Sequence, residues 1–235
     1  MHLEYHSGLS YELLYQAGAF SMLRVALKKG QTIKAQSDAM VCMDSTLDVK
    51  GNMSGGVLGA LGRMFSGESF FFQLVTATRG DGEACFAPEC PGDIIDLEMD
   101  GTPFLVQKGG FFAATEGVEI STTCQNLTRG LFSGEGFFVL RAQGKGVLFL
   151  ESFGAIHVIS LPPGKEIIID NKHLVAWPEQ MNYNIEKASA SGWISSFTSG
   201  EGLVCRFRGP GNIMIQTRNP QVFGQWMNPL LPARG

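Results

Sequence analysis

Three carboxylates recur in one short motif, Ser-Gly-Glu, which each time precedes an apolar run. They are Glu68, Glu135 and Glu201, and their motifs begin at residues 66, 133 and 199. Three carboxylates that converge on one point could bind a hard cation such as Ca²⁺. Ser and Gly are also typical of a β-turn that precedes a strand. A tandem duplication copies such a turn three times, so we expect turns here and predict no metal site.

A glycine-rich segment around residues 54–64 has no counterpart in the other two copies of the repeat. It lacks the lysine and hydroxyl pattern of a phosphate-binding P-loop. One interpretation is an uncharged lip that contacts a partner or ligand, and the other is a crossover that packs over one end of a barrel. The candidate partner or ligand loop consists of Gly55, Gly56, Gly59, Gly62 and Arg63.

Basic residues gather in segments near both ends of the chain. On adjoining strands they could form a patch that binds RNA or an acidic lipid headgroup. The candidate basic patch consists of Arg24, Lys28, Lys29, Arg206 and Arg208.

The elements that would position these residues are short strands. Each Ser-Gly-Glu motif leads into an apolar run, and each run reaches a G-x-G, which allows positive φ and predicts a hairpin. The three G-x-G sequences are Gly80-Asp81-Gly82, Gly144-Lys145-Gly146 and Gly209-Pro210-Gly211. A fixed period of this length indicates a duplicated structural unit. Helix signals are nearly absent, so an all-β fold is expected.

The chain begins part-way through a repeat, so we expect its N- and C-terminal segments to complete one unit jointly, as in a propeller. The prediction is three tandem antiparallel β-sandwich or double-stranded β-helix-like repeats around a pseudo-threefold axis. The expected units are a split repeat (1–64 plus 198–220), a second repeat (65–131), a third repeat (132–197) and a Pro-containing tail (221–235).

Composition narrows the functional classes. The 235 residues are 44% hydrophobic and 17% charged, with a net charge of −4, so no global basic field favours nucleic-acid binding. The five cysteines form no C-x-x-C pair, which argues against disulfides or a zinc site and favours a reducing cytoplasm. No apolar run is long enough for a transmembrane helix, and no secretory signal is expected.

Several motifs together resemble a known family. They are the Gly55 to Arg63 run followed by Ser66-Gly67-Glu68, the recurring Gly-Glu-Gly-Phe starts, Leu174-Val175-Ala176-Trp177, and Trp226, Pro229 and Pro232 in the tail. The chain resembles the bacterial branch of the altered-inheritance-of-mitochondria family, a domain of unknown function. The resemblance implies a fold similar to the tryptophan RNA-binding attenuation protein, with three such units in one chain. It carries over no binding or catalytic residue.

The function predicted from the sequence is a non-enzymatic binding or scaffold protein that acts through self-association or a protein partner. No nucleophile–base pair stands out, so no enzyme activity and no cofactor are expected. The split repeat taken with the tail has a net charge of +4, and the second and third repeats have −7 and −1; such sectors suit a homo-oligomer. Two alternatives stay open: a small-ligand module with sites between repeats, and RNA binding through the basic split repeat.

Overall fold

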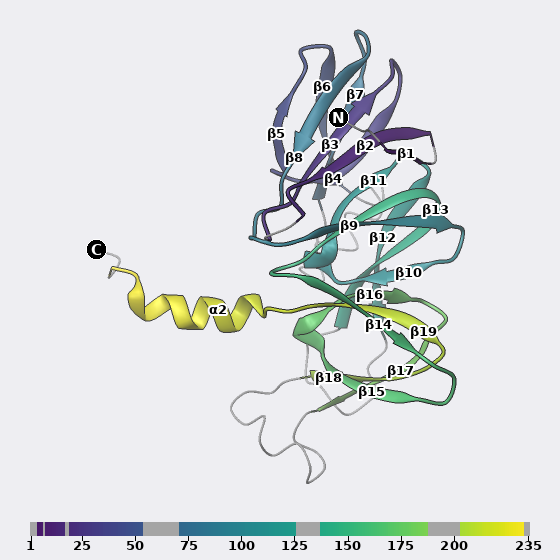
Figure 1. Ribbon diagram of the computed structural model, residues 1–235, viewed down its shortest axis with the longest axis vertical. Helices are drawn as coiled ribbons and strands as arrows, with labels where there is room; N and C mark the ends of the chain where they lie inside the picture. Colours follow the sequence, from purple (N-terminus) through teal and green to yellow (C-terminus); the bar gives the residue numbers. More distant parts are fainter. Residues whose placement is uncertain are drawn as a thin grey trace.

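A computed structural model of the chain describes residues 4–6, 8–16, 19–53, 71–125, 137–187 and 203–232. Antiparallel strands make up most of its regular structure (Figure 1), which confirms the predicted all-β class. In the described ranges, no helix is long and apolar enough to cross a membrane.

The first unit contains six strands in two layers. Strand β7 lies between β4 and β6, and β8 lies between β3 and β5. Their bounds are β3 (Met22–Leu27), β4 (Thr32–Gln36), β5 (Met40–Met43), β6 (Leu47–Met53), β7 (Phe71–Ala77) and β8 (Gly82–Phe86). Two more strands, β1 (Glu4–His6) and β2 (Leu9–Leu14), extend the sheet beyond β3. Burial alternates along β3, as expected for a strand with one face on the core.

The second unit repeats this pairing with one long strand in place of two. The first half of β13 lies between β10 and β12, and its second half lies between β9 and β11. The bounds are β9 (Ile94–Asp100), β10 (Phe104–Val106), β11 (Phe111–Thr115), β12 (Val118–Gln125) and β13 (Phe137–Glu151). A short 3-10 helix, η1 (Lys108–Gly110), links β10 to β11.

The third unit has the same arrangement as the first. Strand β18 lies between β15 and β17, and β19 lies between β14 and β16. The bounds are β14 (Ile156–Leu161), β15 (Glu166–Asp170), β16 (Leu174–Pro178), β17 (Asn182–Lys187), β18 (Leu203–Arg208) and β19 (Gly211–Gln216). The 3-10 helix η2 (Asn171–His173) links β15 to β16.

This pairing corrects the predicted split repeat of residues 1–64 plus 198–220. Strands β18 and β19 pair with β14–β17, whereas β3–β6 pair with β7 and β8. The run after each Ser-Gly-Glu motif therefore completes the strands that precede it rather than those that follow it. The expected boundaries at 65–131 and 132–197 are displaced accordingly by about half a unit.

Strand pairing also joins the units to one another. Strand β4 pairs with β11, and β10 pairs with β16. The corresponding third contact would join β5 to β15, and the strands described here include no such pair. The three units follow one another along the long axis in Figure 1. The pseudo-threefold axis stays a prediction.

The G-x-G sequences are crossings between layers, and not the predicted hairpins. The strands before and after each one pair with different neighbours, and β13 runs through Gly144 and Gly146 without a break. Gly144 has φ of +120°, and a Cβ there would lie 2.1 Å from the Gly117 carbonyl oxygen. Glycine is needed here because the backbone bends tightly against a neighbouring turn.

The core consists of three apolar clusters, and residues of more than one unit contribute to each of them. The first cluster includes Phe149 of β13, whose ring meets Tyr11 edge-on at 4.9 Å between centroids. The middle cluster combines Phe72 of the first unit with Met214 of the third. In the third cluster, Trp177 is fully buried and packs near Phe207. Shared clusters couple the units energetically.

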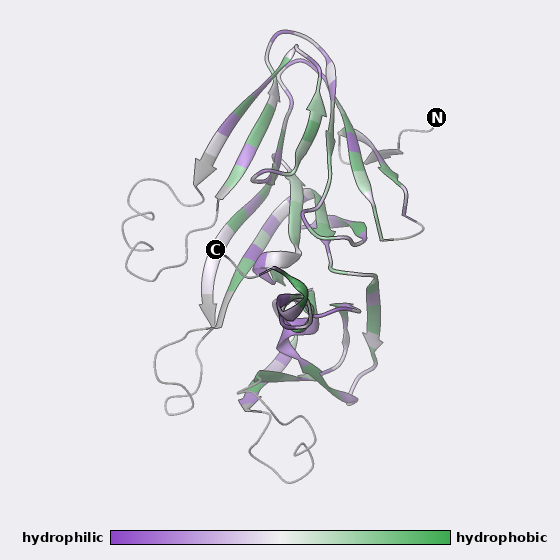
Figure 2. Ribbon diagram, turned by 90° about the vertical axis from the view of Figure 1, so that its left-hand side faces the viewer, coloured by the Kyte–Doolittle hydropathy of each residue, from purple (hydrophilic) through white to green (hydrophobic). Residues whose placement is uncertain are grey.

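A helix leaves the body of strands at the C-terminal end. Helix α2 (Pro220–Met227) has Pro at its start, and the Asn219 side chain accepts hydrogen bonds from the Gln221 and Val222 amides at 3.0 and 3.3 Å. A 3-10 turn, η3 (Asn228–Leu230), follows. Figure 1 shows the helix projecting away from the strands, and Figure 2 shows it end-on. From the sequence we expected only a Pro-containing tail in this region.

Candidate functional site

A cavity of about 460 Å³ lies where residues of all three units and the start of α2 meet. Its lining is rich in carboxamide side chains, and the apolar residues Phe153, Leu174 and Pro220 also contribute to it. The lining includes Gln36, Glu89, Cys90, Gln107, Gly109, Glu151, Asn171, Lys172, Gln216 and Gln221. The volume is within the usual range for a small-molecule site, about 300 to 1,000 Å³.

Strand ends place these side chains. Gln36, Glu151 and Gln216 are the last residues of β4, β13 and β19, and Asn171 follows β15 directly. Glu151 and Gln216 hold corresponding places, since each stands five residues after the second glycine of its G-x-G; Ala87 is their counterpart in the first unit. The cavity is therefore built largely from corresponding strand ends of different units.

Glu151 is the buried acid of this cavity, with only 7% of its surface exposed. Burial raises the pKa of its carboxyl to about 8, the charge of Glu89 adds to the effect, and a hydrogen bond with the Gln36 side chain opposes it. Within the part of the chain that the structure describes, its Oε2 atom has no hydrogen-bond partner. The carboxyl group is therefore mostly protonated at pH 7, and one of its two oxygens has no partner among the described residues.

A second unpartnered oxygen lines the same cavity. The Oδ1 atom of Asn171 is buried, and the described residues provide it with no donor. Its surroundings are otherwise well paired: the Gln216 side chain donates to the Lys172 carbonyl at 2.8 Å and accepts from the Phe153 amide at 2.9 Å. These bonds fix the wall of the cavity and leave two buried acceptors for a ligand.

The predicted partner or ligand loop, Gly55, Gly56, Gly59, Gly62 and Arg63, lies outside the described residues, as do Glu68, Glu135 and Glu201. Its role stays a prediction. No group of three or more His, Cys, Asp or Glu side chains in the described ranges could hold a metal ion. Cys42, Cys85, Cys90 and Cys205 are free thiols.

The predicted basic patch is not brought together. Arg24, Lys28 and Lys29 are on or next to β3, in the upper part of Figure 1, whereas Arg206 and Arg208 are on β18, in a different sheet at the lower end. The two groups of cations are separated because β18 pairs with strands of the third unit and not with strands of the first unit. This corrects the expectation of one patch on adjoining strands.

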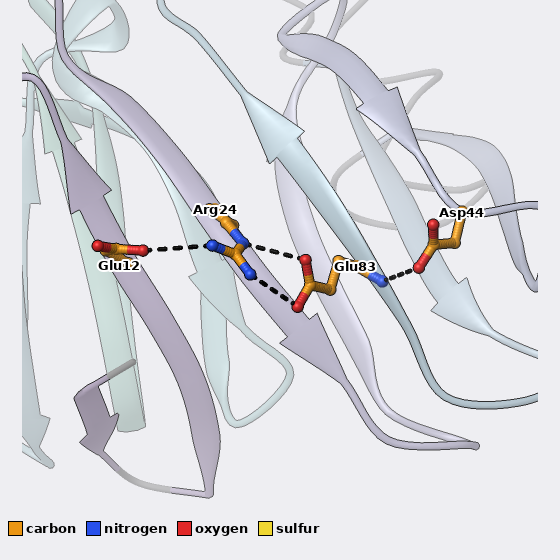
Figure 3. Close-up of polar contacts among 4 residues, drawn as sticks. All are labelled: Glu12, Arg24, Asp44 and Glu83. Atoms are coloured by element: carbon orange, nitrogen blue, oxygen red, sulfur yellow. Dashed lines mark hydrogen bonds and ion pairs between the residues drawn. The ribbon is translucent and has the colours of Figure 1, made fainter. Parts of the chain in front are cut away.

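Carboxylates neutralise three of these cations. Arg24 lies between Glu12 and Glu83 in Figure 3, at 3.0 Å from both Glu83 oxygens and 3.5 Å from Glu12. Lys28 pairs with Asp81 at 2.9 Å. Arg206 pairs with Glu186 at 2.9 Å. Such pairs leave little positive potential for a polyanion, so the structure does not favour RNA binding through this patch.

Comparison with known proteins identifies the family. The model of the family described as "Mitochondrial biogenesis AIM24" matches residues 11–218. The chain belongs to the AIM24 family. An uncharacterised protein of Streptococcus pyogenes serotype M6 is 34% identical over 222 residues, which cover 91% of this chain and 88% of the relative. The resemblance inferred from the motifs is confirmed at the level of the family.

A solved structure of this fold supports the architecture. The crystal structure of a Streptococcus pyogenes protein, determined by a structural genomics consortium, superposes with a TM-score of 0.76 and 31% identity. It covers 95% of the AIM24 chain described here and 100% of its own. The likeness to the tryptophan RNA-binding attenuation protein stays a prediction.

Sequence reasoning missed Glu151 and Asn171 as site residues. Each lies among polar residues just where an apolar strand ends, and no spacing connects the two. The sequence did contain one signal for Glu151. This acid directly follows the apolar run Val147-Leu148-Phe149-Leu150, which predicts a carboxyl group at the edge of the core.

Proposed function

We propose that this AIM24 protein is a cytoplasmic, non-catalytic binding module that takes a small polar ligand in the cavity between its units. The observation that carries the proposal is the buried Glu151 carboxyl, whose Oε2 atom is unpartnered within the described structure and lines the cavity. Buried polar atoms in native proteins are nearly always hydrogen-bonded, and leaving one without a partner is costly. A bound ligand would provide the missing donor.

The amide-rich lining supports a ligand with several hydrogen-bonding groups. Gln36, Gln107, Asn171 and Gln221 offer donors and acceptors from different elements. A site between repeats is one of the alternatives that the sequence left open.

Blocking the cavity tests this function. Gly109 lines the cavity, and a Cβ built on it meets no atom within 4 Å, so the backbone there accepts the Cβ of a Gly109→Leu side chain at the wall. A thermal-shift screen of amino acids, amines, sugars and nucleotides should find compounds that raise the melting temperature, because a ligand of the native state stabilises it. We expect Gly109→Leu to weaken their binding roughly tenfold or more, as measured by calorimetry.

Gly51→Leu is the matched control. Gly51 is exposed in β6 and does not line the cavity, and a Cβ added there would meet no atom within 4 Å. This variant should bind the compounds as the native chain does. The proposal is wrong if no compound stabilises the protein, or if both leucine variants bind equally well.

A second candidate function is self-association through α2. Val222, Phe223 and Trp226 on the helix, with Leu230 and Leu231 after it, expose 45% to 64% of their surface. Residues 219–232 contain no charged side chain, in a chain that is 17% charged. A two-fold interface brings identical surfaces together, and an uncharged apolar surface meets its own copy without repulsion. We infer that the partner of α2 is the same helix of a second copy.

Sedimentation at several concentrations tests this association. Trp226→Glu places a charge within the apolar surface and should weaken the dimer by about 2 kcal/mol, roughly thirtyfold in dissociation constant. Gln225→Glu adds the same charge at the adjacent exposed position and should change the dimer little. A native chain that stays monomeric at high concentration, or a dimer insensitive to Trp226→Glu, would contradict the inference.

A further inference from the structure

The two unpartnered atoms in the cavity are both oxygens, and both accept hydrogen bonds once the Glu151 carboxyl is ionised. Glu151 Oε2 and Asn171 Oδ1 are buried, and the described residues give neither of them a donor. An amide oxygen cannot donate, so Asn171 calls for an N–H or O–H group on the ligand. An ionised carboxylate calls for the same, and its strongest partners are charged N–H groups.

The charge of the lining adds a second constraint. Glu89, Glu151 and Lys172 line the cavity, so its ionisable acids outnumber its one cation in the described lining. The backbone of Lys172 is held at this wall: its carbonyl accepts a hydrogen bond from Gln216 and its amide donates one to Asp170. A buried carboxyl group is ionised at low cost only when a positive charge lies close to it.

We propose that the cavity binds a small organic cation with N–H donors, such as a primary amine or a guanidine, whose charged group lies against Glu151 and Asn171. The proposal rests on the proposed function and names the ligand class of that same site. The ammonium or guanidinium group donates hydrogen bonds to both unpartnered oxygens and supplies a positive counter-charge for the buried carboxylate. The surrounding amides bind the remainder of the ligand.

Binding of such a cation is coupled to release of a proton. The Glu151 carboxyl is mostly protonated at pH 7, because burial raises its pKa to about 8. The cation favours the ionised form, so near pH 7 the complex releases close to one proton. Affinity then rises with pH by up to roughly tenfold per unit below pH 8 and levels off above it. The other titratable groups at the cavity are Glu89, Lys172 and Cys90, and burial raises the pKa of the Cys90 thiol above its usual value, which keeps it neutral in this range.

A series of four-carbon compounds tests the ligand class. Putrescine, n-butylamine and agmatine carry the proposed group, 1,4-butanediol is neutral, and succinate is an anion. Calorimetry at pH 7 in phosphate and in MOPS, two buffers without a primary amine, measures both affinity and proton release. We expect at least one of the amines to bind with proton release, and the diol and the dianion to bind at least tenfold more weakly.

Three variants assign the binding to the two oxygens. Glu151→Gln should lower the affinity of the amine by roughly tenfold to a hundredfold, because a hydrogen bond between charged groups is lost. It should also abolish proton release, because glutamine has no proton to release. Asn171→Ala should weaken binding several-fold and keep the proton release. Glu119→Gln, an exposed position on β12 outside the cavity, should match the native chain. Circular dichroism confirms that each variant is folded.

The outcomes separate this inference from the proposed function. Suppose that the diol or succinate binds, that Gly109→Leu prevents this binding, and that the amines do not bind. The cavity is then a ligand site, but the cation proposal is wrong. Amine binding that is unchanged in Glu151→Gln, or that releases no proton in either buffer, overturns it as well. If no compound of any class binds, both proposals are wrong.

Discussion

The Glu151 carboxyl links the stability of this protein to pH. Its pKa of about 8 in the folded chain is above the ordinary value for glutamate, so the folded state holds this proton more tightly than the unfolded chain does. A raised pKa of this kind gives a stability that is fully present below about pH 4 and declines as pH rises toward 8. Burial is the main cause, because it penalises the charged form.

Replacing this acid should therefore stabilise the ligand-free protein at high pH. Glu151→Gln keeps the shape and removes the ionisation, so its free energy of unfolding should exceed that of the native chain by on the order of 4 to 5 kcal/mol at pH 9 and by little at pH 4. Urea denaturation at pH 4, 7 and 9 measures the difference. Parallel pH profiles for the two proteins would show that the carboxyl is not held in its neutral form.

Among the strands, the sequence predicted the elements better than their partners. The apolar runs after Ser-Gly-Glu and the run Leu174-Val175-Ala176-Trp177 are strands, as expected from local pattern. Whether such a run pairs with the strands before it or after it is decided by packing between distant segments. The same limit applies to G-x-G, which fits a hairpin and a crossing between layers equally well.

The helix and the cavity show two different reasons for a missed prediction. For α2 a local signal was present, since Asn219 followed by Pro220 is a typical helix start. For the cavity there was no local signal, because its lining comes from strand ends that are far apart in sequence. The sequence repeats predict that each unit has corresponding strand ends. Only the folded structure shows which of these strand ends lie together at the cavity.

At the scale of the molecule, the shared core clusters should make the three units unfold together. Phe86 is fully buried in the first cluster, and Phe86→Ala should cost about 3 to 5 kcal/mol. Trp177 lies in the third cluster, and replacing Trp193 and Trp226 by Phe leaves it as the sole tryptophan. In that background, Phe86→Ala should lower the unfolding midpoint reported by Trp177 fluorescence. A midpoint that stays in place would show that the units unfold separately.

The corresponding positions after the three G-x-G sequences carry different side chains, Ala87, Glu151 and Gln216, and the last two line the cavity. Three identical subunits around an axis would present the same residue three times, and three buried acids so close together would repel one another when ionised. Because the units here are joined in one chain, each can change independently of the other two. The cavity can then hold an acid at the end of β13 and an amide at the end of β19, so the proposed ligand, if it is unsymmetrical, would have one preferred orientation.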